Sequence, residues 1–137
     1  MGLWSWWRKR SAAYHTQVYN QLYNEFLEKF ADLRKIFFEL KEALKKRRSI
    51  NYLLPRLIQL RKVHAEVWNI AESLLSMDKN WSGVYSKLGW FHRGVDYMFK
   101  YENNFDYDLA LSNTLPIMEN VLGHIETFLE ETKAKVV

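Results

Sequence analysis

The sequence predicts an all-α protein, an up-down-up-down antiparallel four-helix bundle with an over-long first helix. Three observations support this prediction. Apolar residues recur at alternating steps of three and four along most of the chain, which places them on one face of a helix. No segment keeps the period-two alternation of a strand. Short polar breaks separate four periodic segments, and short connections favour antiparallel neighbours.

The first two helices are expected near residues 11–47 and 50–76. The apolar stripe of the first comprises Leu22, Phe26, Phe30, Leu33, Phe37, Leu40 and Leu44. The stripe of the second comprises Leu53, Leu57, Leu60, His64, Val67, Ala71 and Leu74. Ser49 and Asn51 are candidate caps of the second helix, and Pro55 is expected in or near its first turn, where a missing N–H matters least. The first helix should be about 55 Å long and the second about 40 Å, so the first must overshoot or bend.

The third and fourth helices are expected near residues 80–103 and 106–133. The stripe of the third comprises Trp81, Val84, Leu88, Phe91, Val95 and Met98. The stripe of the fourth comprises Leu111, Leu115, Met118, Leu122, Ile125 and Leu129. Asp78 or Asn80 is a candidate cap of the third helix. Pro116 either kinks the fourth helix or marks its true start.

Length and composition bound the function. The chain has 137 residues, enough for one domain with a sizeable core. It has no Cys, which excludes disulfides, thiol catalysis and thiolate metal sites. It contains neither a Gly-rich phosphate loop nor a Gly-x-Ser-x-Gly elbow. We therefore expect a non-enzymatic protein without a cofactor, divided into a Trp/Arg-rich segment, 1–10, and a bundle domain, 11–137.

The amino-terminal segment is the first candidate partner-binding site, at Trp4, Trp6, Trp7, Arg8, Lys9 and Arg10. Trp favours the headgroup layer of a bilayer, and Lys and Arg are attracted to anionic lipid. The same side chains are also typical anchors of protein interfaces. A third interpretation is that the Trp side chains fold back and cover the end of the bundle beside Trp81.

A second candidate is a basic cluster that would bind anions, formed by Lys45, Lys46, Arg47, Arg48, Arg56, Arg61 and Lys62. No acidic residue interrupts the chain between Ala43 and Ala65. Lys and Arg supply most of the affinity for nucleic acid by neutralising phosphates. Two facts weaken this hypothesis. The dipole at a helix C-terminus favours cations in any case, and the topology places Glu102, Asp106 and Asp108 at the same end.

Four histidines, one on each predicted helix, raise the hypothesis of a metal or haem site at His64 and His92. These two residues can share a level of the bundle, whereas His15 and His124 are expected at other levels. His64 falls on the core stripe. The alternative is therefore a buried, hydrogen-bonded histidine.

The predicted third helix carries a second stripe, comprising Gly83, Lys87, Trp90, Gly94, Tyr97 and Tyr101. Gly inside a helix costs about 1 kcal/mol relative to Ala, so two on one line need a reason. Close packing of a neighbouring helix is one reason. A partner or ligand groove lined by the aromatic residues is the other.

These observations together predict a helical interaction module that acts through its amino-terminal segment and overhanging first helix. Its partner would be another protein, a second copy of the chain or a membrane surface. Self-association is favoured by a basic half, 1–68, and an acidic half, 69–137. The alternative is a nucleic-acid-binding accessory protein. No apolar run is long enough to span a bilayer, and no secretory signal pattern occurs, so we expect a cytoplasmic protein, at the membrane surface if the Trp segment binds lipid.

Overall fold

The computed structural model describes residues 3–100 and 104–136, with side chains for 12–100 and 104–133. It confirms the predicted all-α four-helix bundle, and no strand occurs in the described residues. The elements, in chain order, are α1 (Leu3–Lys45), α2 (Ile50–Met77), η1 (Lys79–Trp81), α3 (Ser82–Lys100), α4 (Tyr107–Leu109), the π-helical turn η3 (Ala110–Thr114) and α5 (Leu115–Val136).

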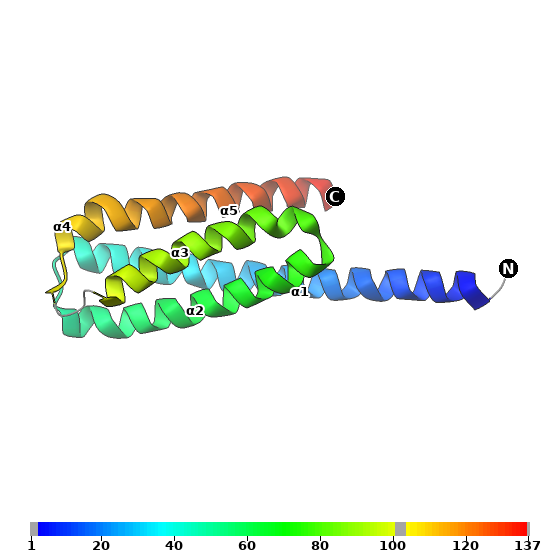
Figure 1. Ribbon diagram of the computed structural model, residues 1–137, viewed down its shortest axis with the longest axis horizontal. Coiled ribbons are helices and arrows are strands. Elements are labelled where there is room, and N and C mark those ends of the chain that lie inside the picture. The colour runs from blue at the N-terminus through cyan, green and yellow to red at the C-terminus, as the bar shows by residue number, and fades with distance from the viewer. Residues whose placement is uncertain (1–2, 101–103, 137) are drawn as a thin grey trace.

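Three helix pairs, α1–α2, α2–α3 and α1–α5, run antiparallel, as the residues joined by their contacts show (Figure 1). Between α1 and α2, Tyr19 bonds Asp78 just beyond α2, and Lys29 pairs with Glu66 further along. Between α2 and α3, His64 contacts His92, whereas Trp68, later in α2, contacts the earlier Tyr85 of α3. Between α1 and α5 the joined pairs are Arg34 with Glu126 and Lys41 with Glu119.

The first helix is much longer than the others, as predicted. It has 43 residues, against 28 in α2, 19 in α3 and 22 in α5. At 1.5 Å per residue α1 is about 65 Å long and α2 about 42 Å. The excess lies at the amino end, where α1 runs on past the bundle (Figure 1). The helix begins at Leu3, so it includes most of the residues of the predicted segment 1–10.

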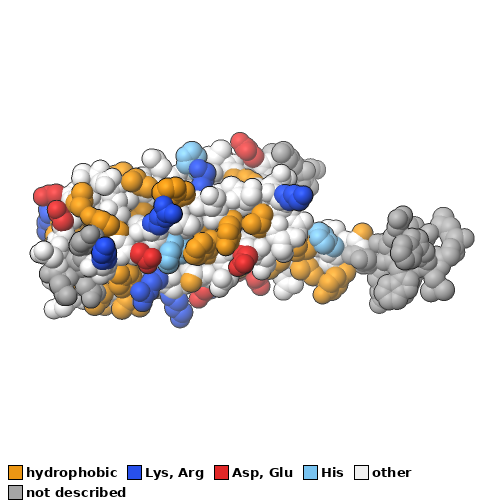
Figure 2. All heavy atoms as spheres, in the orientation of Figure 1, with side chains coloured by type: hydrophobic (Ala, Val, Ile, Leu, Met, Phe, Trp, Pro, Cys, Tyr) orange, Lys and Arg blue, Asp and Glu red, His pale blue; other side chains and the backbone are white. Residues whose placement is uncertain are grey.

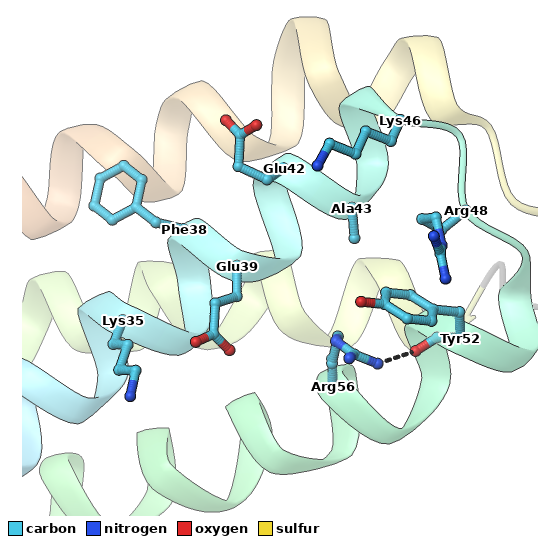
Figure 3. Close-up of a pocket in the computed structure, with 9 residues that line it drawn as sticks. All are labelled: Lys35, Phe38, Glu39, Glu42, Ala43, Lys46, Arg48, Tyr52 and Arg56. Carbon is cyan, nitrogen blue, oxygen red and sulfur yellow. Dashed lines mark hydrogen bonds between the residues drawn. The ribbon is translucent and has the colours of Figure 1, made fainter.

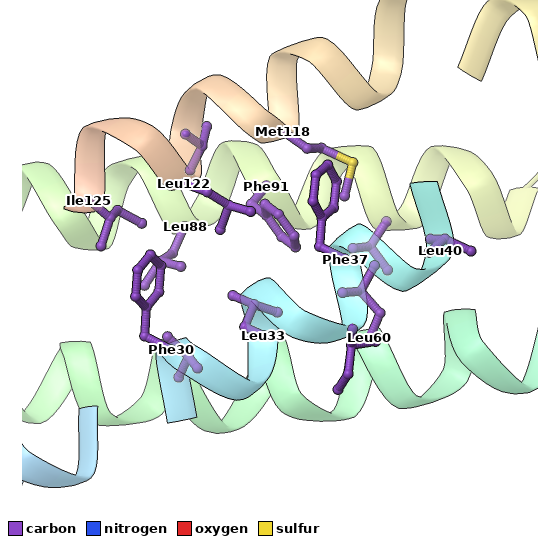
Figure 4. Close-up of a cluster of buried hydrophobic side chains, with 14 of the residues drawn as sticks. Phe30, Leu33, Phe37, Leu40, Leu60, Leu88, Phe91, Met118, Leu122 and Ile125 are labelled. Carbon is purple, nitrogen blue, oxygen red and sulfur yellow. The ribbon is translucent and has the colours of Figure 1, made fainter. Parts of the chain in front are cut away.

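The predicted stripes form most of the core, and Ile36, Ala43, Ala110 and Val121 are buried beside them. Every stripe residue is buried except Leu22 and Leu111, which are partly buried against the same core. Figure 4 shows apolar side chains of several helices meeting in one continuous cluster. At about 25 cal/mol for each Å² of apolar surface removed from water, burial of these large side chains is the dominant stabilising contribution to the bundle.

Some of the predicted side-chain caps are present at the helix ends, and one is not. The Asp78 carboxylate accepts a hydrogen bond from the backbone N–H of Asn80 at 3.0 Å, and so caps η1 ahead of α3. Asp106 accepts from the N–H of Leu109 at 3.0 Å and caps α4. Ser49 occupies the N-cap position of α2, but its side chain forms no capping hydrogen bond. The expected side-chain cap at Ser49 is therefore wrong.

The two prolines lie inside helical segments. Pro116 is the second residue of α5, and the π-helical turn η3 directly precedes α5. Pro has no backbone N–H to donate, and the wider turn of η3 accommodates this missing hydrogen bond. Helix α5 thus starts beside Pro116, but after a helical turn rather than after a loop. Pro55 lies inside α2, beyond the first-turn position that tolerates proline best.

One of the two glycines on the second stripe of α3 is explained by close packing. A Cβ added at Gly94 would lie 2.6 Å from the Sδ of Met118. The absent side chain lets α5 approach α3. A Cβ at Gly83 would meet nothing within 4 Å, so packing gives no reason for that glycine.

Candidate functional site

The amino-terminal part of α1 leaves the bundle at Tyr19. The indole Nε1 of the fully buried Trp81 donates to the Tyr19 hydroxyl at 3.0 Å. That hydroxyl donates in turn to the Asp78 carboxylate at 3.3 Å. Burial, together with the nearby Asp78 charge, raises the pKa of Tyr19 above its usual value. Tyr23, Phe26 and other aromatic rings also cover Trp81, so the described residues already close this end of the bundle.

On the amino-terminal side of Tyr19, the described side chains of α1 become exposed. We call residues 3–18 the α1 extension. All side chains from residue 12 to residue 17 are exposed, and Tyr14 is 70% exposed. The first turn contains no acidic residue, and the first acid in the chain is Glu25. The extension is therefore a basic helix held clear of the bundle.

The predicted partner-binding side chains lie on this extension, within its first eight helical residues. They are Trp4, Trp6, Trp7, Arg8, Lys9 and Arg10. Their backbone belongs to α1, but their side chains lie outside the described part of the structure. Their placement against Trp81, lipid or protein stays a prediction.

The predicted basic cluster does not form a single patch. Lys45 pairs with Glu42 at 3.6 Å along α1. Arg47 pairs with Asp108, as expected for acids gathered at this end. Arg61 lies over the Phe99 ring at 4.2 Å, on the side of α3, and Lys62 is exposed. Glu102, one of the acids expected at this end, lies outside the described residues.

The other three cations of the cluster line a groove between α1 and α2. Lys46, Arg48 and Arg56 line it, and Lys35 joins them from the preceding turns of α1. The groove has a volume of about 660 Å³. Its remaining walls are formed by Phe38, Glu39, Glu42, Ala43 and Tyr52 (Figure 3).

Tyr52 organises the basic end of this groove. The guanidinium carbon of Arg48 lies 4.0 Å from the centre of the Tyr52 ring, and that of Arg56 lies 3.6 Å from it. The ring lies between the two guanidinium groups (Figure 3). Arg56 also donates to the carbonyl oxygen of Tyr52 at 2.9 Å. Stacking and this hydrogen bond restrict both side chains before any ligand arrives.

Sequence reasoning did not include Tyr52 or Lys35 in the site. The signal for Tyr52 was its position four residues from each arginine. Residues four apart on a helix are neighbours, so this spacing predicts stacking of Arg56 on Tyr52 within α2. Arg48 lies in the turn before α2, so its stacking depends on the conformation of that turn. Lys35 had no such signal, because its place depends on how α1 packs beside α2.

His64 is a buried, hydrogen-bonded histidine, as the alternative to a metal site predicted. His64 is 1% exposed, and its Nε2 lies 2.7 Å from the carbonyl oxygen of Leu88. Burial lowers the pKa of His64 from 6.5 to about 4. Its ring stacks on that of His92, with centroids 5.5 Å apart, so the two do share a level. His92 itself faces solvent and lies 3.1 Å from the Asp96 carboxylate.

The structure gives the metal hypothesis no donor set. The His64 Nε2 is occupied by a carbonyl acceptor, so the ring donates there instead of ligating. Among the residues with described side chains, no three His, Asp or Glu residues are grouped closely enough to hold a metal ion.

Comparison with known proteins gives no match, whether to a family model, a curated protein or a solved structure. Within the described residues, no helix has the unbroken apolar length that a bilayer span requires. The described features that could bind a partner or ligand are the α1 extension and the groove between α1 and α2.

Proposed function

We propose that the protein is a helical interaction module that attaches to anionic membrane surfaces through the α1 extension. The observation that carries this proposal is a helix that leaves the bundle with its described side chains exposed from residue 12 to residue 17 and with no acid before Glu25. Three Trp and three cationic residues lie within its first eight helical residues. Trp and basic side chains together are typical of segments that lie in the lipid interface.

An anionic surface would neutralise the charge of this helix. Arg8, Lys9 and Arg10 are the sixth to eighth residues of α1, and the extension contains no acid to compensate them. Anionic headgroups attract such cations, at about 1 kcal/mol for each basic residue near the surface. Lipid would thus supply the negative charge that the extension lacks.

One line along the extension is mostly apolar, and the cations lie off this line. In a helix that begins at Leu3, steps of three and four join Trp4, Trp7, Ser11, Tyr14 and Val18. By the same geometry Arg8 and Arg10 fall on either side of this line, and Lys9 and Trp6 fall away from it. Apolar residues flanked by cations are the pattern of a helix lying in the plane of a membrane surface.

Lipid fits this pattern better than a second copy of the extension does. Two extensions lying side by side would bring together like charges, and the extension contains no acid to compensate them. An acidic protein groove would meet the same charge requirement. A protein partner is therefore an outcome that the test must detect.

The test measures flotation of the full-length protein with lipid vesicles. We expect binding to phosphatidylcholine vesicles only when phosphatidylserine is added, and we expect it to weaken with salt. Changing Arg8, Lys9 and Arg10 together to Gln should reduce binding about a hundredfold, since each charge contributes about 1 kcal/mol. The matched control changes Lys45, Arg61 and Lys62 to Gln, which removes the same charge from the bundle at residues outside the groove.

Two results would contradict the proposal. One is equal loss of binding in both triple variants, which would assign the effect to net charge. The other is no vesicle binding at low salt, together with a solution mass of two or more copies that the Arg8, Lys9 and Arg10 variant reduces to one copy. That result would assign the extension to self-association.

A further inference from the structure

The groove between α1 and α2 contains two arginines that form no ion pair with a carboxylate of the described residues. Arg48 and Arg56 both stack on Tyr52, and within the described part of the chain neither forms an ion pair with a carboxylate. Other cations nearby do find acids, as Arg47 does with Asp108 and Lys45 does with Glu42. Arg48 and Arg56 are therefore held in place while their charge stays available.

The turn that carries Arg48 is fixed by an unusual backbone conformation. Helix α1 ends with hydrogen bonds from the N–H of Arg47 to the Leu44 carbonyl at 3.0 Å and from the N–H of Arg48 to the Ala43 carbonyl at 3.1 Å. This is a Schellman ending, in which Gly usually follows the helix. Here Arg47 occupies that position with φ 55°, a left-handed conformation that costs an L-residue about 1–2 kcal/mol. These hydrogen bonds fix the backbone of the turn, and the Arg48 side chain extends from it onto the Tyr52 ring.

Charge is unevenly distributed along the groove. Lys46, Arg48 and Arg56 lie at the end beside the turn from α1 to α2, whereas Glu39 and Lys35 lie at the other end (Figure 3). Glu42 lines the groove between them and is engaged by Lys45. The positive potential is therefore greatest at the turn end.

Two stacked guanidinium groups and one ammonium group are suited to a compact, doubly charged oxyanion. A guanidinium group binds phosphate oxygens through two parallel N–H donors, and stacking on an aromatic ring restricts the arginine side chain in a fixed orientation. We propose that the turn end of this groove binds the phosphate group of a small phosphorylated ligand, held by Arg48, Arg56 and Lys46 with Tyr52 as the positioning residue. The site lies at the opposite end of the bundle from the α1 extension (Figure 1) and does not depend on the membrane proposal.

Calorimetric titration with inorganic pyrophosphate at low salt tests the site in the full-length protein. We expect one binding site per chain, and at least a tenfold loss of affinity in Arg48→Gln and in Arg56→Gln. The matched control is Arg61→Gln, because Arg61 belongs to the same helix and has the same charge but stacks on Phe99 toward α3. It should change the affinity less than threefold.

A second pair of variants separates a built site from diffuse positive charge. Tyr52→Leu leaves the net charge unchanged but removes the ring that orders both arginines, so pyrophosphate affinity should fall several-fold. Tyr52→Phe keeps the ring and should bind as the natural protein does. Circular dichroism shows whether each variant remains folded. Glu39→Gln should raise the affinity, because it removes a competing carboxylate from the groove.

The proposal fails if pyrophosphate does not bind at low salt, if Arg61→Gln weakens binding as much as Arg48→Gln does, or if Tyr52→Leu binds as tightly as Tyr52→Phe. Stronger binding of a single-stranded oligonucleotide that Arg61→Gln and Lys62→Gln also weaken would replace it with an extended nucleic-acid surface. Vesicle flotation of the Arg48→Gln variant distinguishes a lipid headgroup from a free phosphate. If the ligand is soluble, this variant floats as the natural protein does.

Discussion

His64 links the stability of the core to pH. Its ring is buried against Phe91 and Trp68, and the carbonyl acceptor at Nε2 places the proton of the neutral ring on that nitrogen. Desolvation opposes a second proton, which lowers the pKa to about 4 from 6.5. The unfolded chain therefore binds a proton at a higher pH than the folded protein does.

The folded protein is therefore more stable at neutral pH than at acidic pH as far as His64 is concerned. The stability contributed by neutral His64 is complete above about pH 6.5, is lost progressively as the pH falls, and is fully lost below about pH 4. The loss amounts to roughly 3 kcal/mol. In His64→Gln the amide can still donate to Leu88 but does not titrate, so this part of the acid sensitivity should disappear.

Urea unfolding at pH 7 and pH 4.5 measures the effect. The matched control is His124→Gln, because His124 is exposed and should leave the natural pH dependence in place. Equal acid sensitivity of the natural protein and His64→Gln would show that His64 does not titrate in this way.

At the scale of the elements, the close contact between α3 and α5 depends on one missing side chain. A Cβ at residue 94 would lie 2.6 Å from the Sδ and 2.7 Å from the Cγ of Met118, which is fully buried. We expect Gly94→Ala to lower the free energy of unfolding by about 1–3 kcal/mol, because an overpacked core must shift.

The control for this variant is Gly123→Ala on α5, where an added Cβ meets nothing within 4 Å. That substitution should instead raise the free energy of unfolding by about 1 kcal/mol through helix propensity alone. Chemical denaturation of both variants measures the two changes. Equal stabilisation by the two would contradict the packing role of Gly94.

The helices could be predicted from the sequence because burial imposes a helical period on apolar residues. The whole stripe of α2, from Leu53 to Leu74, is buried as expected, and so is that of α3 from Val84 to Met98. Details that depend on backbone geometry could not be predicted in this way. Ser49 is a favoured cap residue, yet whether its hydroxyl reaches an N–H depends on its rotamer and on the turn that precedes it.

For the candidate sites too, local features could be predicted from the sequence, whereas features that depend on packing could not. The length of α1 and the composition of its extension are properties of one local segment, so the sequence predicted that α1 would either overshoot the bundle or bend, and the structure shows the overshoot. The basic cluster was predicted as one patch, but packing divided it. Arg61 turned toward α3 and Arg47 toward Asp108, while Lys35 of α1 came to line the groove with Arg56 of α2.

The whole molecule presents its two candidate sites at opposite ends of a rigid bundle. On the face drawn in Figure 2, acidic and basic side chains are interspersed over the bundle, so this face offers no single-sign field. The α1 extension projects from one end, and the groove at Arg48 opens at the other (Figure 1). Such a molecule can attach at one end and leave its other end accessible.

Two neighbouring tryptophans provide the sharpest test of membrane attachment through one line of the α1 extension. Trp7 lies on the apolar line with Trp4 and Tyr14, whereas Trp6 lies about 100° away around the helix. The measurement is flotation with phosphatidylserine-containing vesicles of Trp7→Ala and Trp6→Ala, two variants with the same chemical change. We predict that Trp7→Ala binds several-fold more weakly than the natural protein and that Trp6→Ala binds nearly as well. Equal loss in the two variants, or a greater loss in Trp6→Ala, would contradict the account.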